Sequence, residues 1–549
     1  MKNISNKLLL TITASAVLIL SSCTKKIDEA FLNPNAQVVQ PIETLLPNVI
    51  CNMVSAYTAN GTGYGPQNDG LYIGRFIQNW ATSSSGNQYD QMGDNFINSS
   101  DVMGSIWAMQ YYGMGKNISK IIEWGTEQKK WDYVGVAQAI RAWGWMTTTD
   151  IHDEIILKEA FNSDQLTFHY DPQQEVYAEA RRLCFDALAN LSKTGDGVSQ
   201  ANLAKGDAFM NQGNVDKWKK FVYGTLARLH HRLTNKSNLY NPDSVIYYAK
   251  LAMQTNSDNT NFTFDPNGGG YGTYSYWSPF RGNIGAIRQT NFIANLMIGR
   301  DSAFLTGQVD PRAPYIIREN PNGTYRGVRP NKGIDTLATA TAPANFWGGS
   351  FTTTTSPSND AGCRYVFTNK PIFPIMTASE MQFLLAEAYL RKRDKANALI
   401  AYRKGIDLNI QQLRADYETN VPTALRMTQA QVDAYLNNPI NVPAAANLTL
   451  THVMLQKYIA TYAWGICETW VDMRRFHYTD LDPETGKQVY RDFNPPTGTD
   501  LYSRNSGKWI YRHRPRYNSE YLYNVAELNR VGAFALDYIT KECWFSIPQ

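Results

Sequence analysis

Two adjacent helical patterns between residues 377 and 406 constrain the fold of this chain more than any other feature. Thr377 is followed three residues later by Glu380, the spacing of a capping box, which predicts that a helix begins here. The apolar residues that follow recur at the spacing of one helix face: Met381, Leu384, Leu385 and Ala388. A charged turn at residues 391–395 separates this helix from a second one. The residues of the second helix that are expected to face inward are Ala398, Leu399, Tyr402 and Ile406.

Small and aromatic residues within this pair have the spacing of one tetratricopeptide repeat: Leu385, Ala386, Tyr389, Ala398 and Tyr402. Weaker helix pairs are predicted at 134–147 with 172–191 and at 215–233 with a helix that opens at 241–243. Another long helix is predicted at 450–476. A generic helical bundle would show similar apolar faces. Four candidate pairs nevertheless meet the roughly three repeats that a solenoid needs to bury a continuous core. We therefore expect a mainly α fold built on a tetratricopeptide-like scaffold of helical repeats.

Long loops interrupt these helices and carry many of the aromatic residues. They cover residues 61–101, 256–284, 307–368 and 479–519 and are rich in Gly, Asn, Ser, Thr, Tyr and Trp. Structureless insertions of this length in a compact protein are usually either functional or wrongly assigned. The loop-rich insertions are therefore expected to contain short strands and to form a ligand face.

The N-terminus has the pattern of a secretory leader that ends in a lipid-modified cysteine. Lys2 and Lys7 precede an uncharged apolar run at residues 8–20, and small residues then lead to Cys23. This arrangement resembles the bacterial lipobox, which implies cleavage before Cys23 and its acylation, for example with palmitate. We expect a signal peptide at residues 1–22, a lipidated tether at 23–42 and a helical domain at 43–549. The alternatives are an ordinary signal peptide and an uncut anchor, but the run is short of the roughly 20 residues that span a bilayer.

Charge and cysteine content exclude two classes of protein. The formal net charge is +4, which is too small to indicate a nucleic-acid partner. A basic cluster near the C-terminus is surrounded by tyrosines and acidic residues and is expected to be a solvated face or a partner contact: Arg504, Lys508, Arg512, His513, Arg514 and Arg516. With Cys23 lipidated, five scattered thiols remain, which argues against a disulfide-built scaffold and favours buried free thiols.

Four segments resemble, in their order behind the lipobox, motifs of the SusD/RagB family of outer-membrane nutrient-binding lipoproteins. The first runs from Trp145 to Tyr177 and contains Asp150 to Glu154, followed by Tyr170-Asp171-Pro172. The others are residues 374–389 with their Ala-Glu-Ala sequence, 468–476, and 514–524 with Arg514-Pro515 and Ser519-Glu520. The sequence His152 to Ile156 departs from the Gly-Asp-x-Pro-Tyr core that is usual in the family.

This resemblance implies a function and a partner. Members of the family capture nutrients at the cell surface and deliver them to a SusC-like TonB-dependent outer-membrane transporter. We therefore expect a surface-exposed lipoprotein of the outer membrane that captures an oligosaccharide. The alternatives are a peptide ligand for the same kind of transporter and a surface glycoside hydrolase.

No motif of an enzyme or of a metal or cofactor site is apparent. The seven histidines lack the helical His-x-x-x-His spacing of a zinc site, and Cys-x-x-Cys, Gly-x-Ser-x-Gly and phosphate-binding glycine loops are missing. The acidic group of Asp150, Asp153 and Glu154 is expected to be a solvated turn. Oxygen-rich stretches at 90–95 and 258–261 leave structural calcium open, although neither has the bidentate Glu of an EF-hand loop.

The loop aromatics are the strongest candidates for ligand contact. Tyr and Trp offer a flat apolar face that suits the C–H face of a pyranose, and polar neighbours can bind its hydroxyls. The candidate ligand-binding residues are Trp277, Tyr274, Tyr276, Arg281, Trp347, Trp80 and Asn79. Each ring could instead pack a loop onto the helical body. Four aromatics in helical patterns are expected to belong to the core: Tyr57, Trp107, Tyr111 and Tyr112.

Overall fold

The computed structural model describes most of the chain beyond the predicted leader. The described residues are 40–57, 69–86, 89–92, 103–265, 267, 275, 287–334, 337–348 and 360–549, and the side chains of residues 55–57 are left out. The predicted signal peptide, Cys23 and nearly all of the tether lie outside these residues. Helix α2 begins at Ile42, close to the predicted start of the helical domain.

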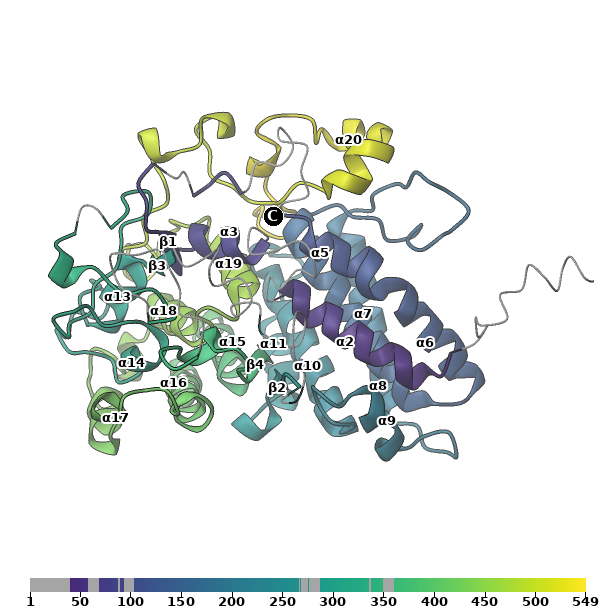
Figure 1. The fold of residues 1–549 in the computed structure, drawn as a ribbon, viewed down its shortest axis with the longest axis horizontal. Helices are drawn as coiled ribbons and strands as arrows, with labels where there is room; N and C mark the ends of the chain where they lie inside the picture. Colours follow the sequence, from purple (N-terminus) through teal and green to yellow (C-terminus); the bar gives the residue numbers. More distant parts are fainter. Residues whose placement is uncertain are drawn as a thin grey trace, which may run out of the picture.

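Consecutive helix pairs form the body of the molecule (Figure 1). The three pairs are α7 (Trp131–His152) with α8 (Gln173–Leu191), α10 (Val215–His231) with α11 (Pro242–Leu251), and α15 (Ala378–Arg391) with α16 (Lys395–Tyr417). Neighbouring pairs pack on each other, because α8 contacts α10 and α11 contacts α15. Helix α18 (Leu450–Ala460) then packs against both helices of the third pair. The expected mainly α scaffold of tetratricopeptide-like helix pairs is confirmed.

The remaining elements are short and cover this body. The other helices are α2 (Ile42–Tyr57), α3 (Asp69–Phe76), α5 (Ser105–Ala108), α6 (Gly115–Glu127), α9 (Gln200–Gly206), α13 (Asn291–Met297), α14 (Ala313–Ile316), α17 (Gln429–Leu436), α19 (Ile466–Arg475) and α20 (Val525–Val531). Two π-helical turns are η1 (Met109–Met114) and η10 (Tyr517–Tyr521). Antiparallel strands form two small sheets, β1 (Trp80–Thr82) with β3 (Ile287–Gln289) and β2 (Thr260–Phe262) with β4 (Phe373–Met376).

Helix starts follow the local sequence, with one difference at the predicted capping box. The Thr377 side chain accepts a hydrogen bond from the Glu380 N–H at 3.2 Å, as expected for an N-cap. The Glu380 carboxylate turns away from the helix start and binds Arg228 in the core instead. The box is therefore half formed, because a buried guanidinium competes for its carboxylate. Pro242 occupies the first turn of α11, behind the Asn241 cap, as predicted.

The long helix predicted at 450–476 is wrong, since the chain breaks between α18 and α19. Ala463 adopts a left-handed conformation with φ 67°, which an α-helix cannot contain. The Ala463 N–H donates to the side-chain oxygen of Asn79 at 2.9 Å. The hydroxyl of Tyr462 donates to the backbone carbonyl of Asn79. A residue that is distant in sequence thus holds the break in place.

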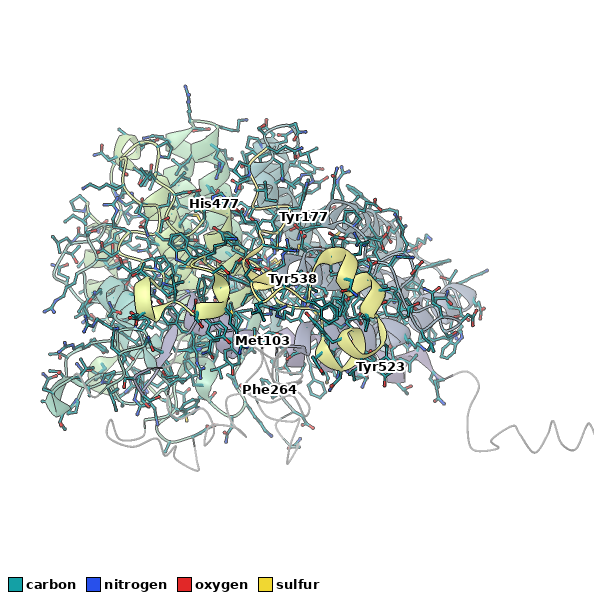
Figure 2. The ribbon with its side chains drawn as sticks, turned by 90° about the horizontal axis from the view of Figure 1, so that it is seen from above. Met103, Tyr177, Phe264, His477, Tyr523 and Tyr538 are labelled. Atoms are coloured by element: carbon teal, nitrogen blue, oxygen red, sulfur yellow. The ribbon has the colours of Figure 1, made fainter. Side chains whose placement is uncertain are left out.

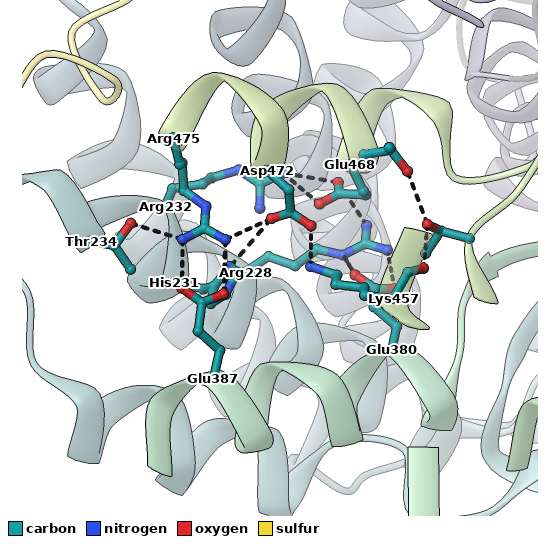
Figure 3. A network of polar contacts seen from close by, with 12 residues as sticks. Arg228, His231, Arg232, Thr234, Glu380, Glu387, Lys457, Glu468, Asp472 and Arg475 are labelled. Carbon is teal, nitrogen blue, oxygen red and sulfur yellow. Dashed lines mark hydrogen bonds and ion pairs between the residues drawn. The ribbon is translucent and has the colours of Figure 1, made fainter. Parts of the chain in front are cut away.

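A buried network of charged side chains joins the helix pairs (Figure 3). Arg228 of α10 binds both oxygens of Glu380 at 2.6–2.7 Å and lies 3.2 Å from Glu468 of α19. Arg232, at the end of α10, binds Glu468 at 2.9 Å and Asp150 of α7 at 2.6 Å. Each of these side chains is less than 5% exposed. Because an unpaired buried charge is costly, these contacts fix how α7, α10, α15 and α19 meet.

The second half of the network surrounds the carboxylate of Glu387 in α15. Arg475 of α19 donates to both of its oxygens at 2.9 Å, and His231 approaches at 2.7 Å. Asp472 accepts from the same guanidinium at 2.9 Å and from Lys457 of α18 at 2.7 Å. Helices α10, α15, α18 and α19 are therefore held at one polar junction inside the scaffold.

The expected solvated acidic turn is wrong for Asp150 and Asp153, which are buried. The expected solvated face or partner contact is wrong for half of the basic cluster, since Arg512, His513 and Arg514 are buried. Asp150 is buried in the network, and Asp153 is buried beside Arg512 at 3.0 Å. Arg514 is buried and donates to the carbonyl oxygens of Ala533, Ala535 and Leu536. These charges hold the C-terminal segment, yellow and marked by Tyr538 in Figure 2, across the helical body.

The five described cysteines are free, in agreement with the expectation of unpaired thiols. Cys184, Cys363, Cys467 and Cys543 are buried, and Cys51 is exposed. The fold therefore depends on packing and on the polar network rather than on disulfides.

Candidate ligand-binding site

Asn79 and Trp80 lie in the core and not on a surface. Both are at most 1% exposed, so the expectation that they are loop residues open to a ligand is wrong for this structure. The Trp80 indole N–H donates to the Leu71 carbonyl at 2.9 Å, and its ring lies where a side chain on Gly74 would have to be. Asn79 binds Ala463 and also donates to the Tyr458 hydroxyl at 2.9 Å.

Trp347 is also fully buried, which again contradicts the expectation of an exposed ring. Its neighbour Phe346 stacks on Phe367 with ring centroids 4.3 Å apart, and the Trp347 ring meets Phe367 edge-on at 6.2 Å. The Arg318 guanidinium donates to the carbonyls of Asn345 and Gly362. These contacts hold residues 345–347 against the helical body.

Tyr274, Tyr276, Trp277 and Arg281 lie outside the described residues. Ser275 among them and Ile287 after them are described. The Ser275 N–H donates to the Asn369 carbonyl at 2.6 Å, and β3 starts at Ile287 and pairs with β1, where Gln289 lies opposite Trp80. The structure thus ties Ser275 to the loop before β4 and pairs β3 with the strand that carries Trp80, while Trp80 and Trp347 are buried.

A polar hollow of about 520 Å³ lies beside Asn369, the residue to which Ser275 is hydrogen-bonded. Its lining residues come from the loop that precedes β4 and from the end of α16 and the turn that follows it: Asp360, Arg364, Tyr365, Thr368, Asn369, Lys370, Pro371, Ile372, Asp416, Tyr417, Thr419 and Asn420. Carboxylate, amide, hydroxyl and ammonium groups predominate. Hydroxyls, amides and charged groups of this kind can orient a polar ligand.

The walls of the hollow are held by hydrogen bonds within the protein. Both carboxylate oxygens of Asp360 accept from the Asn369 N–H, at 2.9 and 2.7 Å. The Tyr417 hydroxyl donates to the Ile372 carbonyl at 2.7 Å, and its ring meets Tyr365 edge-on at 4.7 Å. Tyr365 has φ 57°, a left-handed conformation that is uncommon outside glycine and concentrates at functional sites. The shape of the hollow is therefore largely preformed.

The charged groups around the hollow are balanced. Arg364 pairs with Glu319 at 2.8 Å, and the Lys370 ammonium donates to the Asp265 carbonyl at 2.6 Å. Burial raises the pKa of Asp416, and the nearby Gln412 side chain partly offsets this effect. A neutral ligand fits such a mixture better than a strongly charged one.

Sequence reasoning did not identify the residues of this hollow. Its lining includes common turn residues such as Asn369-Lys370-Pro371 and Thr419-Asn420, which carry no motif. Part of the hollow could have been found from its position in the sequence, because residues 360–368 belong to the aromatic loop at 307–368 that is expected to form the ligand face. The end of α16 gave no comparable signal.

Within the described part of the chain, no group of three or more His, Cys, Asp or Glu side chains could hold a metal ion. The described carboxylates of the two oxygen-rich stretches are engaged by protein groups, and residues 93–95 lie outside the described residues. Asp90 accepts from the Tyr502 N–H and from Asn505, and Asp258 pairs with Lys220. Among the described helices, none combines the length and apolarity that crossing a membrane requires.

Comparisons with known proteins agree with the fold. A SusD-like family model, described as starch-binding and associating with the outer membrane, matches residues 34–496. No curated protein matches the chain. A SusD/RagB family protein from Bacteroides thetaiotaomicron is 20% identical with a TM-score of 0.66, covering 93% of this chain and 100% of that one. A chitin-binding SusD homologue from Flavobacterium johnsoniae is 18% identical with a TM-score of 0.65, covering 92% and 99%. Because this family model matches well over half of the length of the chain, the chain belongs to the SusD-like family.

Proposed function

We propose that this protein captures a neutral oligosaccharide at the outer membrane. The observation that carries the proposal is the preformed polar hollow beside Asn369, to which the backbone of the aromatic segment is tied through Ser275. In this arrangement Trp277 and its aromatic neighbours would stack on a sugar ring while amides and hydroxyls of the hollow bind its hydroxyl groups. The family description and the chitin-binding relative support a glycan over a peptide.

Binding without turnover is part of this proposal. A glycoside hydrolase needs two carboxyl groups on either side of the scissile bond. Asp360 and Asp416 both line the hollow, but Asp360 is engaged by the Asn369 N–H through both oxygens, as expected for a structural group. Incubation of the pure protein with starch- and chitin-derived oligosaccharides should release no shorter products. Product release that disappears in Asp416→Asn would establish the hydrolase instead.

The anchor and the partner complete the proposal. Acylation of Cys23 after removal of residues 1–22 would tether the body through residues 23–42, facing outward, and a SusC-like TonB-dependent transporter would receive the ligand. More than one acyl chain is needed for stable anchoring. In a native host, Cys23→Ala should remove acyl labelling and membrane retention, and wild-type protein should co-purify with the transporter. Retained labelling in the variant would disprove the anchor.

The binding site is tested by calorimetric titration with a panel of neutral gluco- and chito-oligosaccharides. Trp277→Ala should weaken binding by about 1–3 kcal/mol, by analogy with measured losses of aromatic stacking. Thr419→Trp places a large ring on the exposed rim of the hollow and should block it. Tyr247→Ala is the control, because this tyrosine is 61% exposed on α11, outside the site. Unchanged affinity in both site variants would show that the ligand binds elsewhere, and binding of peptides alone would replace the oligosaccharide as ligand.

A further inference from the structure

A second pocket, of about 300 Å³, lies on a different part of the molecule from the polar hollow. It is formed where α5, η1 and the start of α6 meet the connection between α7 and α8 and the π-turn η10. Its lining residues are Trp107, Tyr111, Tyr112, Lys116, Ile156, Ala160, Phe161, Asn162, Ser163, Gln165, Phe168 and Glu520. Five of these are aromatic, so rings dominate its walls.

Three unusual backbone features meet at this pocket. The turn η1 (Met109–Met114) and the turn η10 (Tyr517–Tyr521) are both π-helical, and they contribute Tyr111, Tyr112 and Glu520 to the lining. Phe161, from the opposite wall, has φ 67°. π-turns occur frequently at functional sites, and left-handed conformations of bulky residues are costly and persist where the surroundings enforce them. Their coincidence at one pocket favours a function for it.

The π-turn explains why Tyr112 was wrongly expected to belong to the core. A π-turn contains one more residue per turn than an α-helix, so it rotates the side chains that follow it around the helix axis. Trp107 precedes the turn and is 1% exposed, whereas Tyr112 within it is 62% exposed. The Arg516 guanidinium lies 5.1 Å from the centroid of the Tyr112 ring and supports it from the protein side.

The side chains of the inner walls already have hydrogen-bond and packing partners within the protein. Glu520 accepts hydrogen bonds from the Tyr170 hydroxyl at 2.7 Å and from Asn524 at 3.0 Å. The Phe161 ring packs so closely on Gly115 that a Cβ there would lie 2.0 Å from it, and the Arg141 guanidinium lies 4.9 Å from its centroid. A ligand would therefore meet polar groups on the rim and, inside, the less buried aromatic side chains: Tyr111, Tyr112, Phe161 and Phe168.

We infer that this pocket binds a single sugar ring of a neutral oligosaccharide, as a site separate from the polar hollow. The inference rests on the proposed function, because it assigns the same ligand class to a second place. Tyr112 and the neighbouring rings suit the C–H face of a pyranose. The exposed rim residue Lys116 can bind its hydroxyls. Asn162 donates to Gln165 at 3.2 Å and Gln165 donates to Glu159 at 2.9 Å, and each of these two amides keeps a second N–H for a sugar hydroxyl. The volume is at the lower end of the roughly 300–1,000 Å³ typical of ligand pockets, which suits one ring rather than a longer chain.

The test is calorimetric titration of the mature protein with maltohexaose and chitohexaose, followed by the same titrations of variants. Tyr112→Ala should abolish one class of binding sites or weaken it about thirtyfold, the middle of the range for lost aromatic stacking. Tyr112→Phe keeps the ring and should retain most of the affinity. Tyr247→Ala is the matched control, with 61% exposure against 62% for Tyr112 and a position on α11. Neither removal should unfold the protein, because both rings are mostly exposed.

Each outcome bears on one of the two proposals. Loss of affinity in Tyr112→Ala, with Tyr247→Ala unchanged, supports the second site. Unchanged titrations in Tyr112→Ala together with weaker binding in Trp277→Ala overturn the second site and leave the proposed function standing. Equal losses in Tyr112→Ala and Tyr247→Ala would also overturn it, since the effect would not be local. If the wild-type protein binds neither probe, both proposals fail for these two glycan classes.

Discussion

Replacing Glu387 by Gln should destabilise the protein strongly, because this carboxylate is the centre of the second half of the polar network. It is 0% exposed and receives two hydrogen bonds from Arg475 and one from His231, while Arg391 binds it from the edge of the core. Gln has nearly the same shape. It removes the charge and turns an N–H group toward donors that need an acceptor.

The size of the effect follows from the partners that lose their acceptor. The side chain of Arg391 is 24% exposed and can turn to water, so its loss is small. Arg475 keeps Asp472 and the Thr234 hydroxyl as acceptors but loses half of its bidentate pair, and His231 loses its carboxylate partner. Hydrogen bonds to charged groups contribute about 1.5–3 kcal/mol each. The remaining amide oxygen of Gln recovers one of them, so we expect a loss of about 3–4 kcal/mol, within the ~3–5 kcal/mol of broken buried pairs.

The assay is urea-induced unfolding at pH 7, with Glu484→Gln as the matched control. Glu484 pairs with Lys395 at 2.6 Å, but its side chain is 44% exposed, and such surface pairs contribute about 0–1 kcal/mol. The two variants therefore lose the same charge in different surroundings. If Glu387→Gln costs no more than Glu484→Gln, the buried network does not hold the helix pairs together and the reasoning is refuted.

Two further predictions concern the helix break and the acid side of the stability profile. Asn79→Ala should lower the free energy of unfolding by about 1–3 kcal/mol, because the buried Ala463 N–H loses its acceptor, and it should leave the glycan affinity of the folded protein unchanged. Thermal unfolding and calorimetry check both parts, and weaker binding with normal stability would return Asn79 to the ligand site. Burial lowers the pKa of His152 to about 3 and those of His231 and His452 to about 4. At these three positions the unfolded chain binds more protons between pH 6.5 and 4, which lowers stability as the pH drops. Burial raises the pKa of Asp207 to about 6 and that of Asp301 to about 7, and these two carboxyls act in the opposite direction. We expect the three histidines to outweigh them, so the urea midpoint should fall from pH 7 to 4, and a flat midpoint would contradict this.

The helix pairs could be predicted because their information is local. Apolar spacing, the Thr377 cap and the Asn241-Pro242 start mark α15, α16 and α11 within a few residues. The break between α18 and α19 could not be predicted in this way. It depends on the side chain of Asn79, which accepts a hydrogen bond from the N–H of Ala463, 384 positions further along the chain. The same holds for Glu380, which leaves its capping box for Arg228 of another helix pair.

The ligand face was harder to predict, because aromatic side chains serve equally well inside and outside. Tyr and Trp have an apolar body and one polar edge, so the same residue type can pack a loop or stack on a ligand. Trp80 is buried against Gly74 of α3, and Trp347 is buried beside the Phe346–Phe367 stack. Tyr112, expected in the core, is instead exposed within a π-turn. Loop sequences show where aromatics concentrate but not which of them a neighbouring segment covers.

The placement of charge suggests why a scaffold of this kind can serve different ligands. The residues in the recognisable motifs, such as Asp150, Glu387, Glu468 and Arg475, are committed to the core, where a lost partner costs several kcal/mol. The proposed binding groups lie instead on turns and π-turns that the helices hold only at a few points, such as Ser275 on Asn369. A substitution at Thr419 or Tyr112 leaves the polar network intact, so ligand preference can change at little cost in stability. A fold shared over more than 90% of the chain at 18–20% identity is compatible with this division.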